Sequence, residues 1–493
     1  MNGSVGAWET VIGIEVHVQL RTVSKMFCGC STRFGAPPNT QVCPVCLGLP
    51  GALPVANREA VHLALLAALS LDCSVNLRSE FVRKNYFYPD LPKGYQITQL
   101  AYPLAYDGQV YVREGEAETT IRVRRLHMEE DAGKSMHDRF ERSTAVDLNR
   151  AGVPLIEIVT EPDIRSAAEA RAYLTRLKQI LEYYAQVSDC NMEEGSLRVD
   201  ANLSIRATGE DGLGQKTEVK NLNSFSNVEK ALAHERDRQI AILERGEAVA
   251  GETRLFDVTR SETRPMRGKE EDFDYRFFPE PDLPLLVVEA ERVKAVRAEL
   301  PEAPQALERR LVSQYGLSDY DSRVLSAYPS RATFFERVVG GRDGEFAKTT
   351  ANFMMGEVAK ELNQRDGGGR EEDVVGPDSL ARVVELRLDG TLSAGTAAQA
   401  LALLMAEDGA DVDALVEANG LAQVQDDDQL AAWVENALSS NPDEVTRYRA
   451  GEEKLFGFLL GAVMRQAAGK ADPARARTLL KERLESKPTC GSS

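Results

Sequence analysis

The pattern of hydrophobic residues changes near residue 294, and this change limits the folds that the chain can adopt. From Trp8 to about Leu286, short runs that alternate apolar and polar residues recur between helical patterns. Such alternation is typical of strands that bury one face. After residue 294, strand patterns largely disappear and helical patterns rich in Ala, Leu, Glu and Arg continue. The 493 residues therefore predict a mixed α/β region followed by an all-helical one, with several domains.

Two helices of the first region have recognisable start signals. Ser166 is followed three residues later by Glu169, and Ser226 by Glu229. This spacing is that of a capping box, in which the serine side chain accepts a hydrogen bond from a free N–H of the first turn. We therefore expect helices to begin directly after Ser166 and Ser226.

Composition excludes several classes of protein. No apolar run approaches the roughly 18 residues needed to cross a bilayer, and the N-terminus has no secretory signal pattern. Seven cysteines, four of them clustered, do not suit a secreted disulfide framework, so we expect a cytoplasmic protein with no membrane partner. The net charge of −18 disfavours a DNA-coating surface but still allows a local basic patch for RNA.

The four clustered cysteines predict a metal site. Cys28 and Cys30 form C-x-C, and after twelve residues Cys43 and Cys46 form C-x-x-C. Two close pairs joined by a short loop suit a tetrahedral thiolate site, and four cysteine ligands leave no open position. The favoured interpretation is structural zinc. Four reduced thiols or an iron–sulfur cluster are the alternatives.

Charged residues interrupt the apolar strand patterns. The segment Trp8–Val18 alternates, and its apolar even positions predict a buried face, so Glu15 and His17 share the opposite face. The segment Leu197–Ile205 alternates likewise and leaves Asp200 on its polar face. These two strands could therefore place acidic and imidazole groups on one side of a sheet.

If the chain uses ATP, metal and side chains must hold the phosphates, because neither common glycine-rich phosphate loop is present. Mg²⁺ prefers hard oxygen ligands, so carboxylates from several strands on one sheet face would suit it. The candidate ligands are Glu15, His17, Glu129, Glu130, Asp131, Asp200 and Glu218. The cations that could balance phosphate charge are Lys134, Arg198, Lys216 and Lys220. Taken singly, each is more often an ordinary surface charge; the crowding of Glu129–Asp131 and the placement of Glu15 and His17 favour a site.

The end of the chain reverses the overall charge. Residues 450–493 contain eight basic and five acidic residues, a balance of +3 in a chain of −18. This makes the C-terminal region the better candidate for contact with an RNA backbone. An ordinary charged helical surface is the alternative interpretation.

Long blocks, in order along the chain, match one family. They are Val11–Leu20, Arg83–Ile97, His127–Lys134, Asp147–Glu157, Met192–Asn202, Glu218–Phe225 and Asp274–Pro284. In these blocks the chain resembles the B subunits of aspartyl/glutamyl-tRNA(Asn/Gln) amidotransferases. The resemblance covers essentially the whole chain.

The resemblance implies three domains. The first, over 1–294, is an α+β catalytic cradle with a glutamine synthetase-like fold, mainly an antiparallel sheet with helices. A helical domain over 295–407 follows, and a small helical domain over 408–493 binds tRNA.

The resemblance also implies a ligase that forms carbon–nitrogen bonds. The γ-phosphate of ATP is transferred to the side-chain carboxylate of Glu-tRNA(Gln) or Asp-tRNA(Asn), and ammonia then displaces the phosphate. A separate amidase subunit supplies the ammonia from glutamine through an internal channel, and a small third subunit completes a heterotrimer. This chemistry is sound, because phosphorylation gives a carboxylate a good leaving group and the intermediate must be kept from water.

By position in the blocks, the resemblance assigns ligation of magnesium and phosphate to Glu15, His17, Glu130, Asp200 and Glu218. Glu129 is the alternative to Glu130, and the sequence does not distinguish them. Arg83, Lys84, Asn85 and Tyr86 would form the nucleotide or aminoacyl pocket, and Lys134, Arg198 and Lys220 would add positive charge. Zinc at the cysteines is a structural option in this family and is not required for activity.

Two other functions compete with this one. A tRNA-binding scaffold without catalysis has no reason to retain crowded carboxylates at Glu129–Asp131. An independent amide ligase with its own glutaminase would need a Cys–His site, and the clustered cysteines are better explained by a metal.

Overall fold

The computed structural model describes residues 8–115, 117–140, 142–266, 274–365, 369–407, 409–423, 427–467 and 470–485. The chain divides into two compact units, one ending at Gln305 and the other beginning at Ala306. The expected boundary at 294/295 falls inside helix α4 (Ala290–Glu299), whose Val296 is buried in the core of the first unit. Residue 408, where the tail domain was expected to begin, lies outside the described residues.

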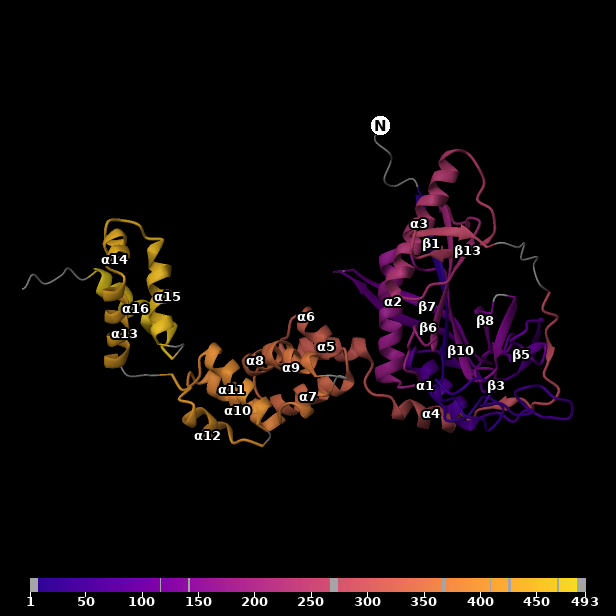
Figure 1. Ribbon diagram of the computed structural model, residues 1–493, viewed down its shortest axis with the longest axis horizontal. Helices are drawn as coiled ribbons and strands as arrows, with labels where there is room; N and C mark the ends of the chain where they lie inside the picture. Colours follow the sequence, from indigo (N-terminus) through magenta and orange to yellow (C-terminus); the bar gives the residue numbers. More distant parts are fainter. Residues whose placement is uncertain are drawn as a thin grey trace, which may run out of the picture. The chain divides into compact units, whose positions relative to one another are not determined.

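The first unit is built on a nine-stranded sheet with the order β14-β13-β12-β11-β1-β10-β7-β6-β2 (Figure 1). Its strands are β1 (Trp8–Gln19), β2 (Ser74–Val75), β6 (Ala105–Glu114), β7 (Ala117–Glu130), β10 (Pro154–Thr160), β11 (Leu197–Ala207), β12 (Thr217–Lys220), β13 (Thr253–Asp257) and β14 (Glu262–Pro265). Neighbouring strands are antiparallel except for the parallel pair β12–β13. The sheet is thus mixed but mainly antiparallel, as expected for an α+β domain, and β1 lies at its centre.

Three smaller sheets flank the large one. They are β15 (Phe278–Pro279) with β4 (Val82–Asn85) and β5 (Tyr95–Thr98), then β16 (Leu286–Val287) with β3 (Arg78–Ser79), and β8 (Lys134–Phe140) with β9 (Ser143–Asp147). The first of these contains the sequence block in which a substrate pocket was expected.

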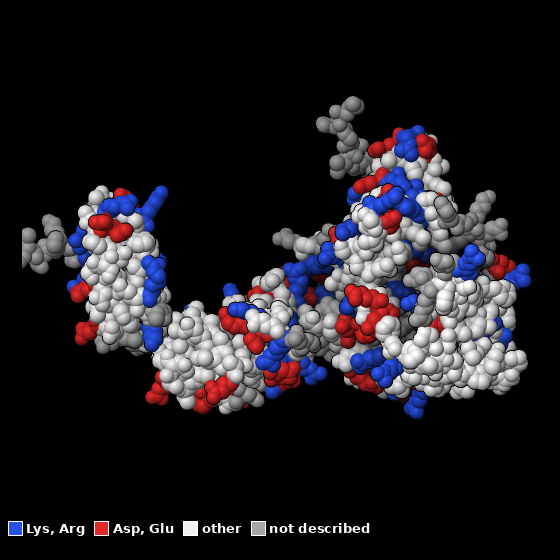
Figure 2. All heavy atoms as spheres, viewed as in Figure 1, with Lys and Arg blue, Asp and Glu red and all other residues white. Residues whose placement is uncertain are grey.

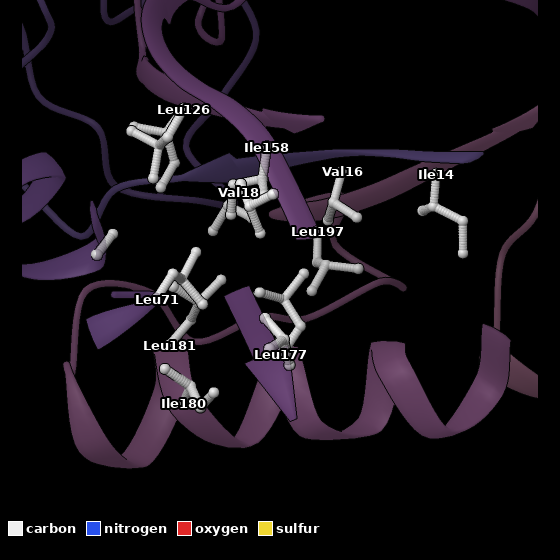
Figure 3. Packing of buried hydrophobic residues seen from close by; sticks show 14 of the residues in the cluster. Ile14, Val16, Val18, Leu71, Leu126, Ile158, Leu177, Ile180, Leu181 and Leu197 are labelled. Atoms are coloured by element: carbon white, nitrogen blue, oxygen red, sulfur yellow. The ribbon is translucent and has the colours of Figure 1, made fainter. Parts of the chain in front are cut away.

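Helices supply the apolar cover of one sheet face. They are α1 (Arg58–Ser70), α2 (Ala167–Gln179), which continues into the π-helical turn η1 (Ile180–Tyr184), and α3 (Phe225–Glu244). Figure 3 shows Val16 and Val18 of β1 on the side of the sheet that faces Leu177 of α2 and Leu181 of η1. Burying this face leaves the opposite face of the sheet for polar side chains.

One of the two expected helix starts is confirmed and the other is wrong. Ser166 caps α2, because its Oγ accepts a hydrogen bond from the Glu169 N–H at 2.9 Å. Helix α3, however, begins at Phe225, and Ser224 caps it by accepting from the Asn227 N–H at 3.1 Å. Val228, Ala231 and Leu232 of this helix are buried in the core. The helix that packs there is therefore capped by Ser224, two residues before the expected cap.

The second unit is helical throughout its described residues. Its helices are α5 (Pro304–Tyr315), α6 (Asp319–Leu325), α7 (Pro329–Val339), α8 (Gly344–Phe353), η2 (Met354–Val358), α9 (Ala359–Gln364), η3 (Glu371–Asp373), α10 (Pro377–Leu388), α11 (Ala394–Ala406), α12 (Val412–Ala418), α13 (Asp427–Ser440), α14 (Pro442–Arg449), α15 (Leu455–Gln466) and α16 (Pro473–Glu485). The last four share a core of their own that includes Val434, Leu459, Val463 and Leu480. In the described ranges of the chain, no helix has both the length and the apolar character to cross a membrane.

Candidate active site and metal clusters

The polar face of the large sheet brings together side chains from five strands. The β1 alternation buries Ile14, Val16 and Val18, so Glu15 and His17 lie on the opposite face, as expected. Directly paired residues of antiparallel strands share a face. Glu15 pairs with Asp200, and His17 pairs with Arg198 on one side and Glu157 on the other. Glu157 in turn pairs with His127 on β7, and Glu218 on β12 pairs with Asn202, which is two residues from Asp200 and therefore on the same face.

The first cluster on this face consists of His17, Glu129 and Glu157. The His17 Nε2 lies 3.2 Å from a carboxylate oxygen of Glu157 and 3.8 Å from one of Glu129. One potential ligand atom from each of the three residues lies within 4.8 Å of the others, which is close enough to hold a metal ion. Both carboxylates are buried. The donor set of two carboxylates and one imidazole fits a divalent cation.

Two histidines compensate the buried charge of this cluster. His127 is 3% exposed, and its Nε2 lies 3.4 Å from the same Glu157 oxygen that His17 contacts. Burial alone would lower the pKa of His127, but the charges of Glu157 and Glu129 raise it to about 9. The same interactions hold the pKa of Glu157 below its usual range despite burial. The histidines thus keep Glu157 ionised, which is the form of a carboxylate that binds a divalent cation.

The second cluster on this face consists of Glu15, Asp200 and Glu218. Burial raises the pKa of Glu15, and nearby Glu157, Glu218 and Asp200 raise it further. Burial also raises the pKa of Asp200, while Lys220 and His17 oppose the effect. Such crowded carboxylates favour a bound cation, which would relieve their mutual repulsion.

Polar neighbours hold the second cluster in position. The Asn202 amide donates to Glu15 at 3.1 Å. The Thr253 hydroxyl donates to Glu218 at 2.9 Å, and the Lys220 ammonium lies 3.4 Å from the same carboxylate. Lys220 is thus beside the carboxylates, where it could meet a phosphate.

Arg198 is held at the edge of the first cluster. Its guanidinium donates to Asp131 at 3.0 Å, and Gln19 donates to the other oxygen of this buried carboxylate at 2.7 Å. Burial would raise the pKa of Asp131, but Arg198 and Arg150 lower it overall. Lys134, in contrast, is exposed at the start of β8, on a separate two-stranded sheet.

The structure does not bring Glu130 into either cluster. Because successive strand residues point to opposite faces, Glu129 joins His17 while Glu130 points away. The Glu130 carboxylate ion-pairs with Lys93 and accepts from the Ile97 N–H at 3.0 Å. It lines a cavity of about 150 Å³ together with Phe27 and Cys46.

The four residues of the expected substrate pocket lie on two different sides of β4. The Arg83 guanidinium binds Glu280 through two hydrogen bonds of 2.7 and 2.8 Å, and the Asn85 amide donates to the Arg276 carbonyl at 2.9 Å. These two residues therefore hold the 276–280 segment. Lys84 lies over the Tyr275 ring at 4.9 Å, and burial and the charge of Glu129 raise the pKa of Tyr86. Lys84 and Tyr86 are thus the residues of this block on the side of the carboxylates.

The four predicted cysteine ligands come together. One sulfur from each of Cys28, Cys30, Cys43 and Cys46 lies within 4.8 Å of the others, and the Cys43 and Cys46 sulfurs are 3.9 Å apart. Zn–S bonds of ≈ 2.3 Å at tetrahedral angles place sulfurs roughly 3.8 Å apart, so the set fits zinc. The Cys28 thiol and the Lys25 ammonium lower the pKa of Cys46 to about 4 against the effect of burial. A thiolate is the form that binds metal.

The same regions match known proteins. Residues 10–294 match the family model described as the GatB/GatE catalytic domain, and residues 333–484 match the one described as the GatB domain. The aspartyl/glutamyl-tRNA(Asn/Gln) amidotransferase B subunit of Halorhodospira halophila is 49% identical over 97% of this chain and 99% of its own length. The protein of the same name from Chlorobium phaeobacteroides is 48% identical over 97% of this chain and all of its own.

The chain belongs to the GatB family.

The match to the GatB/GatE catalytic domain contains both carboxylate clusters and all four cysteines. The family names describe an amidotransferase subunit, so membership supports the catalytic hypothesis over the scaffold alternative. A subunit name also implies an assembly of more than one chain.

The sequence analysis did not identify two residues at the centre of the polar sheet face, Glu157 and His127. Glu157 stands within Pro154–Thr160, where its neighbours Ile156 and Ile158 are fully buried. A single acidic residue in such an apolar strand is the same signal that identified Glu15 and His17. Applied to β10, it would have identified Glu157 as well.

Proposed function

We propose that this chain is the ATP-using, tRNA-binding subunit of a tRNA-dependent amidotransferase. It phosphorylates the side-chain carboxylate of Glu-tRNA(Gln), Asp-tRNA(Asn) or both, and ammonia then displaces the phosphate. The observation that carries this proposal is the cluster of His17, Glu129 and Glu157 on one sheet face, beside the half-buried carboxylates of Glu15, Asp200 and Glu218, within a GatB/GatE catalytic domain. Buried like charges cost stability unless a cation is bound, which favours a site over a chance surface.

His17, Glu129 and Glu157 would hold one Mg²⁺. Glu15, Asp200 and Glu218, whose charges interact on the same sheet face, would contribute to a second. Bound Mg²⁺ would neutralise phosphate oxygens and the charge that develops as the γ-phosphate is transferred. Arg198 and Lys220, at the edges of the two clusters, attract and orient the phosphates and the substrate carboxylate. His127 keeps Glu157 ionised and in position.

The 3′ end of the aminoacyl-tRNA would reach this face past an aromatic row. The Tyr86 ring centroid lies 6.3 Å from that of Tyr88 and 6.0 Å from that of Tyr275, and Phe277 follows at 5.9 Å. Tyr88 is 62% exposed, so the row runs from the carboxylates to the surface. Unpaired bases stack on such side chains, and Lys84 adds a cation beside them.

Partners supply what the clusters do not. A separate amidase subunit provides ammonia from glutamine through an internal channel, and a small third subunit completes a heterotrimer. The glutamine synthetase-like character of the cradle and a cytoplasmic location belong to the same proposal. The mainly antiparallel sheet and the subunit name of the relatives support these assignments.

Cys28, Cys30, Cys43 and Cys46 would bind zinc as a structural ion. Their spacing and the 3.9 Å separation of two sulfurs support this. Since four thiolates fill a tetrahedral site, such an ion would fix the loop that contains them and take no part in the reaction.

An amidation assay tests the proposed function. The chain, assembled with its amidase and small subunits, is given Glu-tRNA(Gln) or Asp-tRNA(Asn), ATP and Mg²⁺ with glutamine or ammonium. We expect amide formation with ADP release, and we expect His17→Ala and Glu157→Gln to lower it by about 100-fold or more with either nitrogen source. Glu210→Gln, at an exposed position, is the matched control.

Loss with glutamine but not with ammonium would place the defect in ammonia supply and contradict the phosphorylation assignment. Absence of ATP turnover by the wild-type assembly with both tRNAs would leave only the scaffold function.

A further inference from the structure

Lys25 is a fully buried lysine that none of the proposed reaction steps uses. Its exposed fraction is 0%, and its ammonium lies 2.7 Å from the Gln41 carbonyl, 3.4 Å from the Leu148 carbonyl and 3.7 Å from the Cys46 sulfur. An ammonium has three protons to donate, so these three acceptors use all of them.

A buried cation needs a compensating charge. No carboxylate of the described residues lies within ion-pair distance of Lys25, although burying an unpaired ammonium is costly. The nearest anionic candidate is therefore the Cys46 sulfur. Four thiolates around one divalent ion carry an excess of negative charge, which a neighbouring cation would reduce.

The backbone of Lys25 also belongs to the cysteine loop. Its N–H donates to the Cys30 carbonyl at 2.9 Å, which closes the turn that contains Cys28 and Cys30. The side chain then reaches the other pair of cysteines at Cys46. One residue thus contacts both halves of the cluster.

The third acceptor, Leu148, connects this cluster to the support of the catalytic face. In the same 147–152 segment, the Arg150 side chain donates to the Ala132 carbonyl at 2.9 Å and the Gly152 N–H donates to the Asp131 carbonyl at 2.8 Å. Asp131 holds Arg198 at 3.0 Å. The Lys25 ammonium therefore lies between the cysteine loop and the loop that backs Asp131.

We propose that Lys25 is a positioning residue of the cysteine cluster, which compensates the charge of the metal–thiolate group and ties its loop to the 147–152 segment. This inference rests on the zinc site proposed above. Lys25 acts through the Cys46 sulfur and does not ligate the ion.

Metal competition on the full-length chain tests the proposal. Wild type, Lys25→Met, Lys25→Gln and the exposed control Lys294→Met are loaded with Zn²⁺ and titrated with a chelator. We expect Lys25→Met to weaken Zn²⁺ binding by roughly 10- to 100-fold, the usual effect of removing a hydrogen-bonding partner of a metal ligand. Lys25→Gln, which keeps donors but loses the charge, should show a smaller loss, and Lys294→Met none.

Co²⁺ substitution separates this role from a general contribution to folding. We expect the thiolate-to-cobalt absorption of Lys25→Met to shift to lower energy, because Cys46 loses a hydrogen bond. The difference in unfolding temperature between metal-loaded and metal-stripped protein should also shrink, whereas a merely structural lysine would lower both temperatures alike.

An unchanged absorption band and unchanged Zn²⁺ affinity in Lys25→Met would overturn the proposal. If that variant does not fold, wild-type affinity in Lys25→Gln would overturn it instead. A wild-type chain that binds neither Zn²⁺ nor Co²⁺ would overturn the zinc site and this inference together, whereas metal binding that is insensitive to Lys25 would overturn only the inference.

Discussion

Glu129 and Glu130 are adjacent in the chain, but their carboxylates serve different surroundings. Glu129 accepts from the Thr98 hydroxyl at 3.2 Å and lies 3.8 Å from His17. Glu130 ion-pairs with Lys93 beside the cysteine loop. Successive residues of a strand face opposite sides of the sheet, so the two carboxylates lie on different faces. A shift of one residue in the register of β7 would place Glu130 beside His17 and Glu129 on the other face.

Replacing each glutamate by glutamine should therefore give different results. We expect Glu129→Gln to weaken the binding of Mn²⁺, used as a probe for Mg²⁺, by at least about 10-fold. Loss of a residue that only hydrogen-bonds a metal ligand lowers metal affinity by about 10- to 100-fold, so loss of a ligand itself should cost at least as much. Glu130→Gln should bind Mn²⁺ as wild type does. Titration followed by electron paramagnetic resonance of free Mn²⁺ measures both, and equal weakening by the two variants would contradict the assignment of Glu129.

Helix α3 shows how a polar network can fix an element on the sheet. The Glu235 side chain is fully buried and binds Arg238 through hydrogen bonds of 2.9 and 2.6 Å. It also accepts from Gln239 at 2.8 Å and from the Thr263 hydroxyl of β14 at 2.8 Å. The network thus joins α3 to the edge strand β14, which is separated by β13 from β12 and its Glu218.

We expect Glu235→Gln to destabilise the first unit by roughly 1.5–3 kcal/mol at pH 7, because it removes charge-assisted hydrogen bonds, although Glu252 stays close to Arg238 and Arg254. Burial would raise the pKa of Glu235, but Arg238, Gln239 and Thr263 lower it overall. Because the pKa is lower in the folded state, the ionised carboxylate stabilises the fold at pH values above its unfolded-state pKa of about 4.3. This stabilisation is lost as the pH falls through the folded-state pKa. The effect of the substitution should therefore diminish below about pH 4.

Urea unfolding followed by Trp8 fluorescence, in a Trp433→Phe background, measures this difference, since the chain has two tryptophans. Glu244→Gln, exposed at the end of the same helix, is the control. A loss in Glu235→Gln that stays constant between pH 7 and pH 3 would refute the ionic origin.

At the scale of the whole molecule, charge is distributed unevenly over a strongly acidic chain. The carboxylate clusters lie in the first unit. Among the helices α13–α16, which have a core of their own, exposed basic residues exceed acidic ones on α16. Figure 2 shows lysine and arginine side chains along one edge of these helices. This distribution suits a protein that does phosphate chemistry with one part and holds an RNA backbone with another.

Substituting Arg477 and Lys481, which are exposed four residues apart on α16, tests the second part. We expect the double alanine variant to weaken tRNA binding and to reduce the slope of log affinity against log salt by roughly 2, since each lost phosphate contact contributes about 1. Lys294→Ala with Arg297→Ala on α4 is the matched control. An unchanged slope measured by filter binding would favour an ordinary charged surface.

Short-range sequence patterns were enough to predict several local features of this protein. Alternation in Trp8–Val18 was enough to place Glu15 and His17 opposite a buried face, and C-x-C with C-x-x-C was enough to gather four sulfurs, because both depend on short-range geometry. The Ser166 cap was equally local.

Only the tertiary structure decided which distant groups meet. Strand register set Glu157 between His17 and His127, and packing chose Ser224 over Ser226 as the cap of α3. Contacts between distant segments also decide that Glu129, and not Glu130, meets His17. They likewise bring three acceptors to the Lys25 ammonium. Such contacts arise when sheet pairing and core packing close long loops, and no local sequence pattern encodes them.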